Sequence, residues 1–380
     1  MNWGFKSSKI QNLSKIGVAN IGGYVVSAGL WFILAGFLES EKYGELSYLI
    51  AIAGIVTSVC LIGGPQSIIV FSAKKIQLQG TIFIISFISS IFSAVILYVF
   101  LQNLEIGIFV IGSVIYNLTI SELLGRKSYG TYSKLFLLQK VLQFVLAIGL
   151  YFIMGEVGIL LGIGLSFFVM IKVFYENIKN NKLDFKLLKQ KMTFIINIYI
   201  RDLTKAFKGN IAHIMIAPLF GFSLLGNYHL GLQVFGILAI IPGIITNFVI
   251  SEEASGESMK KIKKYTISLS VVFAGLGFFV APEVLPYFFP KYEDVVDLIP
   301  ILSLAVIPAT ISNMLISTFL SKENSKPIVI GYGISIIVLI IGIVILGSTI
   351  GALGLAISFL LSQISYTIFL ASIKKFYKNI

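Results

Sequence analysis

The feature that most constrains this chain is a series of apolar runs, each about twenty residues long, that recurs from one end to the other. A helix needs roughly 20 predominantly apolar residues to cross the hydrocarbon core of a bilayer. A transmembrane β-strand would be about half as long and would alternate apolar with polar side chains, which these runs do not do. The runs therefore predict an all-α integral membrane protein with many spans.

Composition agrees with this class and excludes several others. Of the 380 residues, 57% are hydrophobic and 12% are charged, whereas soluble domains carry about a quarter charged residues. One cysteine, Cys60, and two histidines, His213 and His229, are too few for a disulfide framework or a metal centre built from these residues. No phosphate-cradling loop or zinc-protease motif is present. We expect a protein without metal or cofactor that is neither an ATP-driven pump nor an enzyme.

The runs predict twelve transmembrane spans. Their approximate bounds are Ile16–Gly36, Leu46–Phe71, Gly80–Leu101, Leu104–Ile120, Leu135–Met154, Val157–Tyr175, Thr193–Phe220, Leu224–Ile250, Tyr265–Ala281, Val295–Leu320, Ile328–Leu346 and Gly351–Ile373. Five prolines inside these spans predict kinks, because proline removes a backbone hydrogen bond and clashes with the preceding turn. They are Pro65, Pro218, Pro242, Pro300 and Pro308.

The loops between the spans alternate between basic and acidic. With the N-terminus placed inside, 27 of the 29 Lys and Arg residues fall on the inner side, and only Lys42 and Lys291 fall outside. Such an excess is what the positive-inside rule predicts. It places both termini in the cytoplasm and the protein in the cell membrane, and it explains the net charge of +12 without a nucleic-acid partner.

Weak internal repetition predicts two six-helix lobes in the same orientation. Ala35-Gly36-Phe37-Leu38, followed by Gly44, is echoed 182 residues later by Ala217-Pro218-Leu219-Phe220 and Gly226. The segment 157–162 is echoed by 350–354, at an offset of 192 to 193 residues. Parallel-repeat transporters have such halves. We therefore expect an N-terminal lobe over 1–175, a basic cytoplasmic linker over 176–191 and a C-terminal lobe over 192–380.

The seventh span carries a basic face, which makes it the candidate cargo site. Asn197, Arg201, Lys205 and Lys208 recur at steps of four, four and three, so they share one side of a helix. A charged side chain at membrane depth has to face protein or water and marks a functional path by default. Alternatively, the same residues are only the cytoplasmic flank of the span. Asp202 and Lys205 are three residues apart, and their pairing would leave Arg201 and Lys208 free.

Two further cations are candidates for the same cationic cavity. Arg126 follows the fourth span and Lys140 lies early in the fifth. Either they extend the cavity across the first lobe, or they are an inner loop and its snorkelling ends. His213 is expected to be a packed, hydrogen-bonded side chain.

Four short motifs resemble one known family. The segment 34–46, with Leu34-Ala35-Gly36-Phe37-Leu38 and Tyr43-Gly44-Glu45-Leu46, is similar to the first loop of polysaccharide-repeat-unit flippases. Leu61-Ile62-Gly63-Gly64-Pro65-Gln66 resembles the glycine-proline pattern of their second helix. Phe289-Pro290-Lys291-Tyr292 and Gly351-Ala352-Leu353-Gly354 resemble their ninth loop and last helix. These are the Wzx-type members of the multidrug/oligosaccharidyl-lipid/polysaccharide exporter superfamily.

This resemblance implies a MATE-like V of two six-helix bundles that moves a polyprenyl-pyrophosphate-linked oligosaccharide from the cytoplasmic to the outer leaflet. Alternating access through a cationic central cavity is the implied mechanism, and glycosyltransferases or a polysaccharide polymerase are the implied partners. Two alternatives stay open. One is an efflux carrier for organic cations with the same fold, and the other is an integral-membrane glycan polymerase or ligase.

Overall fold

The structure is a computed structural model that describes residues 3–181, 183–254, 258–321 and 324–376. Within these residues the regular secondary structure is helical. The chain divides into two compact units. Unit 1 comprises Met1–Trp31 and Leu49–Ala206, and unit 2 comprises Phe32–Tyr48 and Phe207–Ile380. Three helices pass from one unit into the other, namely α1 (Trp3–Phe37), α2 (Ser40–Cys60) and α10 (Met192–Phe220).

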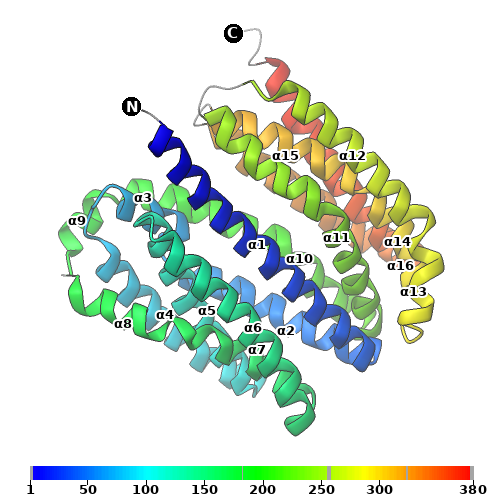
Figure 1. Ribbon diagram of the computed structural model, residues 1–380. Coiled ribbons are helices and arrows are strands. Elements are labelled where there is room, and N and C mark those ends of the chain that lie inside the picture. Colours follow the sequence, from blue (N-terminus) through cyan, green and yellow to red (C-terminus); the bar gives the residue numbers. More distant parts are fainter. Residues whose placement is uncertain (1–2, 182, 255–257, 322–323, 377–380) are drawn as a thin grey trace. The chain divides into compact units, whose positions relative to one another are not determined.

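Unit 1 is organised around α5, whose side chains are mostly buried. This helix packs against α3, α4 and α7 (Figure 1). The remaining helices of unit 1 are α3 (Gly64–Ala73), α4 (Gln79–Leu101), α5 (Leu104–Gly125), α6 (Tyr129–Met154), α7 (Glu156–Ser166), the 3-10 turn η1 (Phe167–Met170), α8 (Ile171–Asn180) and α9 (Phe185–Gln190).

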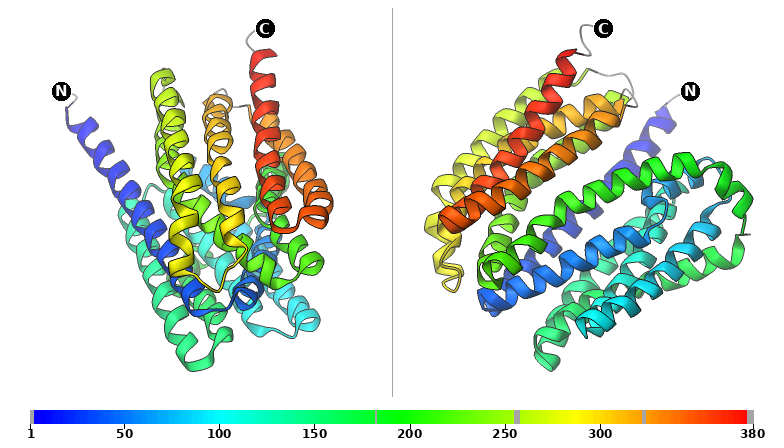
Figure 2. Two further views of the ribbon diagram at one scale, coloured as in Figure 1. Left: turned by 90° about the vertical axis from the view of Figure 1, so that its right-hand side faces the viewer. Right: turned by 180° about the vertical axis from the view of Figure 1, so that it is seen from behind.

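Unit 2 has its core where the end of α10 meets α11, α14 and α16. Ile216, Leu225, Leu298 and Ile343 are fully buried there. The helices of unit 2 are α11 (Phe222–Ala254), α12 (Lys260–Phe279), α13 (Ala281–Phe288), α14 (Val295–Leu304), α15 (Val306–Ser321) and α16 (Lys326–Phe376). Figure 2 shows α16, in orange and red, as two arms that lie side by side and are joined by a sharp turn.

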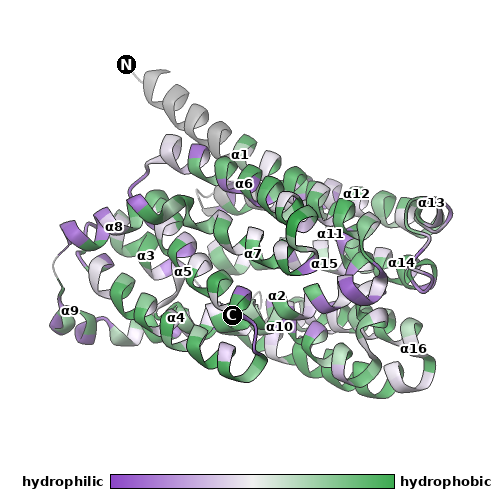
Figure 3. Ribbon diagram, turned by 90° about the horizontal axis from the view of Figure 1, so that it is seen from below, coloured by the Kyte–Doolittle hydropathy of each residue, from purple (hydrophilic) through white to green (hydrophobic). Residues whose placement is uncertain are grey.

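Ten helices of the described residues are long and apolar enough to cross a membrane, and Figure 3 shows how strongly hydrophobic residues dominate the helices. The prediction of an all-helical, multi-pass membrane protein is confirmed. α10 is not among the ten, since its charged and polar side chains lower its hydropathy. α16 counts once, although Ile350 and Gly351 have non-helical dihedral angles and separate two predicted spans. The count of twelve stays a prediction.

One span predicted as continuous is broken. The second span, expected over Leu46–Phe71, ends as α2 at Cys60 and restarts as α3 at Gly64. Gly63 and Gly64 both have positive φ, at +90° and +68°, and Pro65 opens the new helix, where its missing N–H is not needed. The tenth span is continuous over Val295–Ser321, although a tighter turn at Ala305, whose N–H donates to the Leu302 carbonyl oxygen (3.1 Å), separates α14 from α15. In contrast, α10 and α11 continue through Pro218 and Pro242.

The segment predicted as a linker, 176–191, contains helical structure. α8 continues the sixth span to Asn180, and Asp184 caps α9 by accepting a hydrogen bond from the Leu187 backbone N–H (2.8 Å). Lys182, within this segment, lies outside the described residues. The division into compact units falls at Ala206 and Phe207, inside α10.

The two units contain hairpins with the same local geometry. Between α6 and α7, Gly155 has φ +68° and ψ −146°; between the arms of α16, Gly351 has φ +56° and ψ −131°. A Cβ on Gly158 would lie 2.2 Å from the Leu150 carbonyl oxygen, and one on Gly354 would lie 2.0 Å from that of Leu346. Each equivalent pair differs by 196 positions, so the structural offset of this repeat is 196 and the offset of 192 to 193 expected from sequence is wrong.

The two copies of the other repeat, around Gly44 and Gly226, contact each other inside unit 2. A Cβ on Gly44 would lie 1.9 Å from the Phe222 carbonyl oxygen, and a Cβ on Gly226 would lie 1.9 Å from the Ser40 carbonyl oxygen. Gly44 and Gly226, like Ser40 and Phe222, are 182 positions apart. This is the offset found in the sequence, and the reciprocal contact is what a pseudo-twofold axis between α2 and α11 requires. The Ser40 and Ser223 hydroxyls, 2.8 Å apart, join the same helix starts.

Candidate functional site

α10 carries the four residues that the sequence assigned to the cargo site. Their spacing keeps them on one side of the helix. Asn197 and Lys205 are exposed, while Arg201 and Lys208 are partly buried. Residues up to Ala206 belong to unit 1, so Lys208 lies in unit 2 although it continues the same helical face.

Arg201 is paired with its neighbour in sequence. Its Nε and Nη2 both donate to Asp202 Oδ1, at 3.2 and 3.0 Å, and both side chains keep about a quarter of their area exposed, 26% and 25%. The Asp202–Lys205 pairing expected from the spacing is wrong. Asp202 is directed toward the break between α2 and α3, where a Cβ on Gly64 would lie 2.5 Å from its Oδ2. The glycine at 64 therefore makes room for this carboxylate.

Lys208 is held by aromatic rings. Its Nζ lies 4.0 Å from the ring centroid of Tyr366 and 5.0 Å from that of Tyr332. A cation over an aromatic face is attracted by the negative centre of the ring, with an energy of about 0.5 to 2 kcal/mol. In the part of the chain that the structure describes, no carboxylate forms an ion pair with Lys208. The side chain is thus sheltered while its positive charge stays uncompensated.

Lys140 belongs to a row of hydrogen-bonded polar side chains in unit 1, the polar seam, whose other members are Gln139, Gln143 and Ser166. Its Nζ donates to Gln143 Oε1 (3.3 Å) and lies 5.9 Å from the Phe136 ring. Gln139 Nε2 donates to Ser166 Oγ (3.0 Å) within the same seam. Lys140 is thus hydrogen-bonded to an amide of α6, and that amide also accepts from Gln139 Nε2 (3.2 Å).

Arg126 lies at the opposite end of α3 from Asp202. It pairs with the buried carboxylate of Glu122, and its Nη2 donates to Asn177 Oδ1 (3.0 Å). It also lines a pocket with Lys75 and Lys127. Because α3 separates this pocket from the Gly64–Asp202 contact, Arg126 is placed apart from the face of α10.

The histidines meet in unit 2, which sequence reasoning did not foresee. His213 Nε2 and His229 Nδ1 are 2.9 Å apart, and His229 Nε2 is 3.1 Å from Gln233 Nε2. The expectation that His213 is packed and hydrogen-bonded is confirmed. A usable signal existed, since both histidines lie eight residues from Gly221, where α10 turns into α11, and so share one level of that hairpin. Within the described residues, no cluster of three or more His, Cys, Asp or Glu side chains could hold a metal ion.

A second unforeseen cluster joins three helices of unit 2. Lys263 Nζ pairs with Glu253 Oε1 (2.5 Å) and donates to Thr318 Oγ1 (2.7 Å). Ser317 Oγ donates to Glu253 Oε2 (2.7 Å). The sequence showed these charges only as basic and acidic flanks of neighbouring spans, because nothing in their spacing links α11, α12 and α15.

The fold is similar to that of several solved membrane transporters. A structure of the lipid II flippase MurJ, in an inward closed conformation, superimposes with a TM-score of 0.73 at 13% identity, covering 94% of this chain and 87% of that chain. An inward-facing multidrug resistance MATE family transporter gives 0.68 at 15% identity, with coverages of 93% and 95%. A MOP superfamily transporter from Pyrococcus furiosus, described as having a binding pocket of reversed polarity, gives 0.65 at 14% identity, with coverages of 96% and 95%.

These structural neighbours are transporters and not enzymes. No family model matches the sequence, and a comparison with curated proteins finds no match. At identities this low, the likeness establishes the fold and leaves the cargo to be inferred from the residues of this chain.

Proposed function

We propose that this chain is a flippase of the Wzx type, which moves a polyprenyl-pyrophosphate-linked oligosaccharide from the cytoplasmic to the outer leaflet for polysaccharide biosynthesis. It would act beside the glycosyltransferases that assemble the glycan and the polymerase that extends it. The glycan and the pyrophosphate cannot cross hydrocarbon unaided, whereas the polyprenyl tail can stay in the bilayer throughout.

The observation that carries this proposal is the environment of Lys208. Its side chain lies seven residues beyond Arg201, so it is about 10 Å further along the helix. A purely topological lysine at the membrane edge has no need of two tyrosine rings. An uncompensated ammonium at this depth is costly to hold, and an anionic cargo is the partner that would offset this cost.

Three other residues of α10 would add contacts to a pyrophosphate, namely Arg201, Lys205 and Asn197. Each contact between unit charges at 4 Å is worth about 1 kcal/mol in water and about 4 kcal/mol at an effective dielectric of 20. Arg201 uses two N–H groups on Asp202, and a guanidinium has five, so three stay available for phosphate oxygens. Lys205 is exposed and adds a mobile cation, and Asn197 adds an amide donor for phosphate or sugar.

Alternating access is the proposed mechanism, in a protein of twelve spans with both termini in the cytoplasm. The cationic face of α10 would line a central passage that opens to each side of the membrane in turn. Lys140 with its amide neighbours would extend the polar lining in unit 1. We leave Arg126 out of the cargo site, because its guanidinium is held by Glu122 and Asn177 in a separate pocket.

A second candidate function keeps the fold and changes the cargo. The likeness to multidrug resistance MATE transporters is nearly as close as that to MurJ, which favours an efflux carrier for organic cations. Tyr332 and Tyr366 would suit such a cargo, but the polar face of α10 carries three cations, which would repel it, and the carboxylate of this helix is paired with one of them.

A cell-based export assay tests the proposal. Lys208→Met keeps the aliphatic stem between the tyrosine rings and removes only the charge, so we expect normal abundance and a loss of surface glycan of at least tenfold. The matched control is Lys326→Met, which removes one charge from an exposed position at the start of α16. Export by Lys208→Met at the rate of the control would rule out cargo recognition by this lysine.

A further inference from the structure

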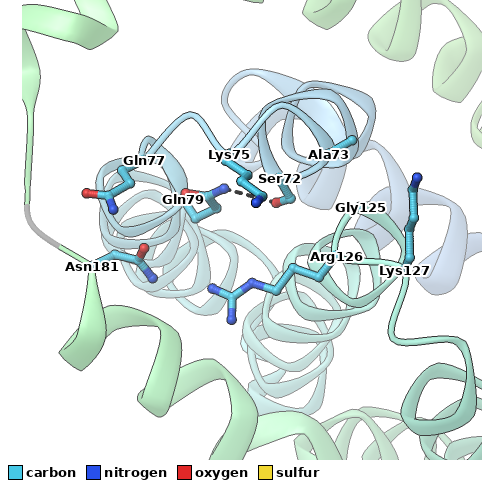
Figure 4. Close-up of a pocket in the computed structure, with 9 residues that line it drawn as sticks. All are labelled: Ser72, Ala73, Lys75, Gln77, Gln79, Gly125, Arg126, Lys127 and Asn181. Atoms are coloured by element: carbon cyan, nitrogen blue, oxygen red, sulfur yellow. Dashed lines mark hydrogen bonds between the residues drawn. The ribbon is translucent and has the colours of Figure 1, made fainter.

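Unit 1 contains a pocket of about 430 Å³ at the termini of four helices, and most of its lining residues are polar or basic. It opens between the end of α3, the start of α4, the end of α5 and the segment after α8 (Figure 4). Its lining residues are Ser72, Ala73, Lys75, Gln77, Gln79, Gly125, Arg126, Lys127 and Asn181. The functions proposed above use none of this pocket.

The charge of the pocket selects an anion. Lys75, Arg126 and Lys127 bring three cations to it, while the adjacent carboxylate is Glu122, which is paired with Arg126. In Figure 4 the side chains of Lys75 and Arg126 extend into the space beside Gln79, whereas that of Lys127 points away. Arg126 is held in place by Asn177, so its remaining N–H groups are positioned to bind phosphate oxygens.

Gln79 indicates that the ligand brings a hydrogen-bond donor as well as a negative charge. The residue is 5% exposed, and its Nε2 donates to Ser72 Oγ (3.0 Å). Its Oε1 is buried and has no hydrogen-bond partner among the described residues. Buried carbonyl oxygens are nearly always paired. A ligand hydroxyl in the pocket supplies the missing donor once the Gln79 amide turns this oxygen toward it.

The depth of the pocket indicates where such a ligand comes from. The candidate spans Gln79–Leu101 and Leu104–Gly125 each end in the pocket, and the ends of spans lie at the level of lipid head groups. Farther along, α4 exposes a row of apolar side chains, including Ile88, Phe92 and Val99. The same helix thus offers a polar start for a head group and an apolar surface for acyl chains.

We propose that this pocket binds the head group of an anionic phospholipid that carries a hydroxyl beside its phosphate, as phosphatidylglycerol does. Lys75 and Arg126 bind the phosphate, and Gln79 Oε1 accepts a hydrogen bond from the head-group hydroxyl. The site is separate from the face of α10 and does not depend on the identity of the transported cargo.

Native mass spectrometry of the full-length protein in detergent tests this site. The probes are phosphatidylglycerol, phosphatidylmethanol, which has the same charge but no hydroxyl, phosphatidylcholine, and soluble glycerol 1-phosphate. Wild-type protein should retain phosphatidylglycerol over both other lipids. Lys75→Gln should weaken this binding about fivefold, since a lysine near an anionic lipid contributes about that factor. Lys186→Gln on α9 removes an equally exposed charge outside the pocket and should change nothing.

The hydroxyl contact has its own variant. Gln79→Met keeps the size of the side chain and removes the carbonyl oxygen, so it should erase the preference for phosphatidylglycerol over phosphatidylmethanol while Lys75→Gln keeps it. Equal binding of all three lipids by wild-type protein would overturn the proposal. So would loss of bound phosphatidylglycerol on adding millimolar glycerol 1-phosphate, because the ligand would then be a soluble phosphate ester.

Discussion

At the scale of single residues, the two partly buried cations of α10 differ in the groups that balance their positive charge. Arg201 has Asp202 beside it, whereas Lys208 lies against the faces of Tyr332 and Tyr366 and forms no ion pair with a carboxylate among the residues that the structure describes. Two residues of the same charge on one helical face are therefore expected to respond differently to substitution.

Arg201→Ala should lower both stability and transport. It leaves the Asp202 carboxylate unpaired against the α2–α3 break, at a cost of about 1 kcal/mol, because both side chains keep partial exposure to a screening solvent. Arg201→Ala combined with Asp202→Ala should recover the thermal stability of wild type without recovering glycan export. Thermal unfolding in detergent and an export assay on the same three variants would measure this. Recovery of export by the double variant would show that Arg201 acts only as a structural partner.

Sequence spacing identified the cations of α10 but not their partners. The pattern at steps of four, four and three depends only on the helical repeat, and α10 has that repeat. Where the Asp202 side chain lies depends on Gly64, which leaves room for its carboxylate. Gly64 is 138 positions away and lies near Asp202 because the second span breaks there. The tyrosines around Lys208 come from α16, more than a hundred residues further on, so no local pattern could indicate them.

At the scale of helices, close backbone contacts fix the positions of the elements. Gly44 and Gly226 let the starts of α2 and α11 cross with each backbone against the other. The apolar runs predicted the ten candidate spans of the described residues but not the break between α2 and α3. The bounds predicted at Leu101 and Leu104 leave Gln102 and Asn103 for the turn between α4 and α5, where Asn103 Oδ1 accepts from the Ile106 N–H (3.0 Å). The repeat offset of 196 was missed because the glycine of this contact lies on the second helix of the hairpin in unit 1 but on the first arm of the hairpin in unit 2. Gly162 packs on Leu146 in unit 1, whereas Gly342 packs on Ser358 in unit 2.

Gly44→Ala and Gly226→Ala should each destabilise the protein by about 1 to 3 kcal/mol or more, because an added Cβ would overlap a backbone carbonyl oxygen that cannot move freely. The matched control is Gly36→Ala in α1, where an added Cβ meets nothing within 4 Å. Alanine is the better helix former, so this control should be neutral or slightly stabilising. Thermal unfolding of the three variants provides the comparison, and equal midpoints for all three would contradict the crossing.

At the scale of the whole molecule, the helical membrane fold could be predicted from hydropathy, and structural comparison agrees with it at the level of fold. The cargo could not be read in the same way, because the fold is shared by proteins described as a lipid flippase and as multidrug transporters. Orientation in the membrane rests on the distribution of 27 of 29 basic residues and is open to direct test.

Cysteine labelling in intact cells would test that orientation. Single cysteines at Lys186 and Met259 should react only after the membrane is made permeable, and those at Glu41, Ser223 and Glu293 should react from outside. Lys182 and the C-terminal residues 377–380, which this topology also places inside, lie outside the described residues. The native Cys60 is buried, so background labelling should be low. Labelling of Lys186 or Met259 from outside would contradict the twelve-span topology.

Reconstitution of the purified protein into proteoliposomes would test whether it moves a lipid-linked oligosaccharide and whether Lys208 is needed. Proteoliposomes would contain a polyprenyl-pyrophosphate-linked oligosaccharide on the inner leaflet, and its arrival on the outer leaflet would be followed by its accessibility to an added glycosidase. We expect wild-type protein to accelerate this transfer. Lys208→Met should reduce the rate of transfer at least tenfold, whereas Lys326→Met should leave it unchanged. Wild-type protein that leaves the lipid-linked oligosaccharide in place but moves an organic cation such as ethidium would contradict the account and favour an efflux carrier.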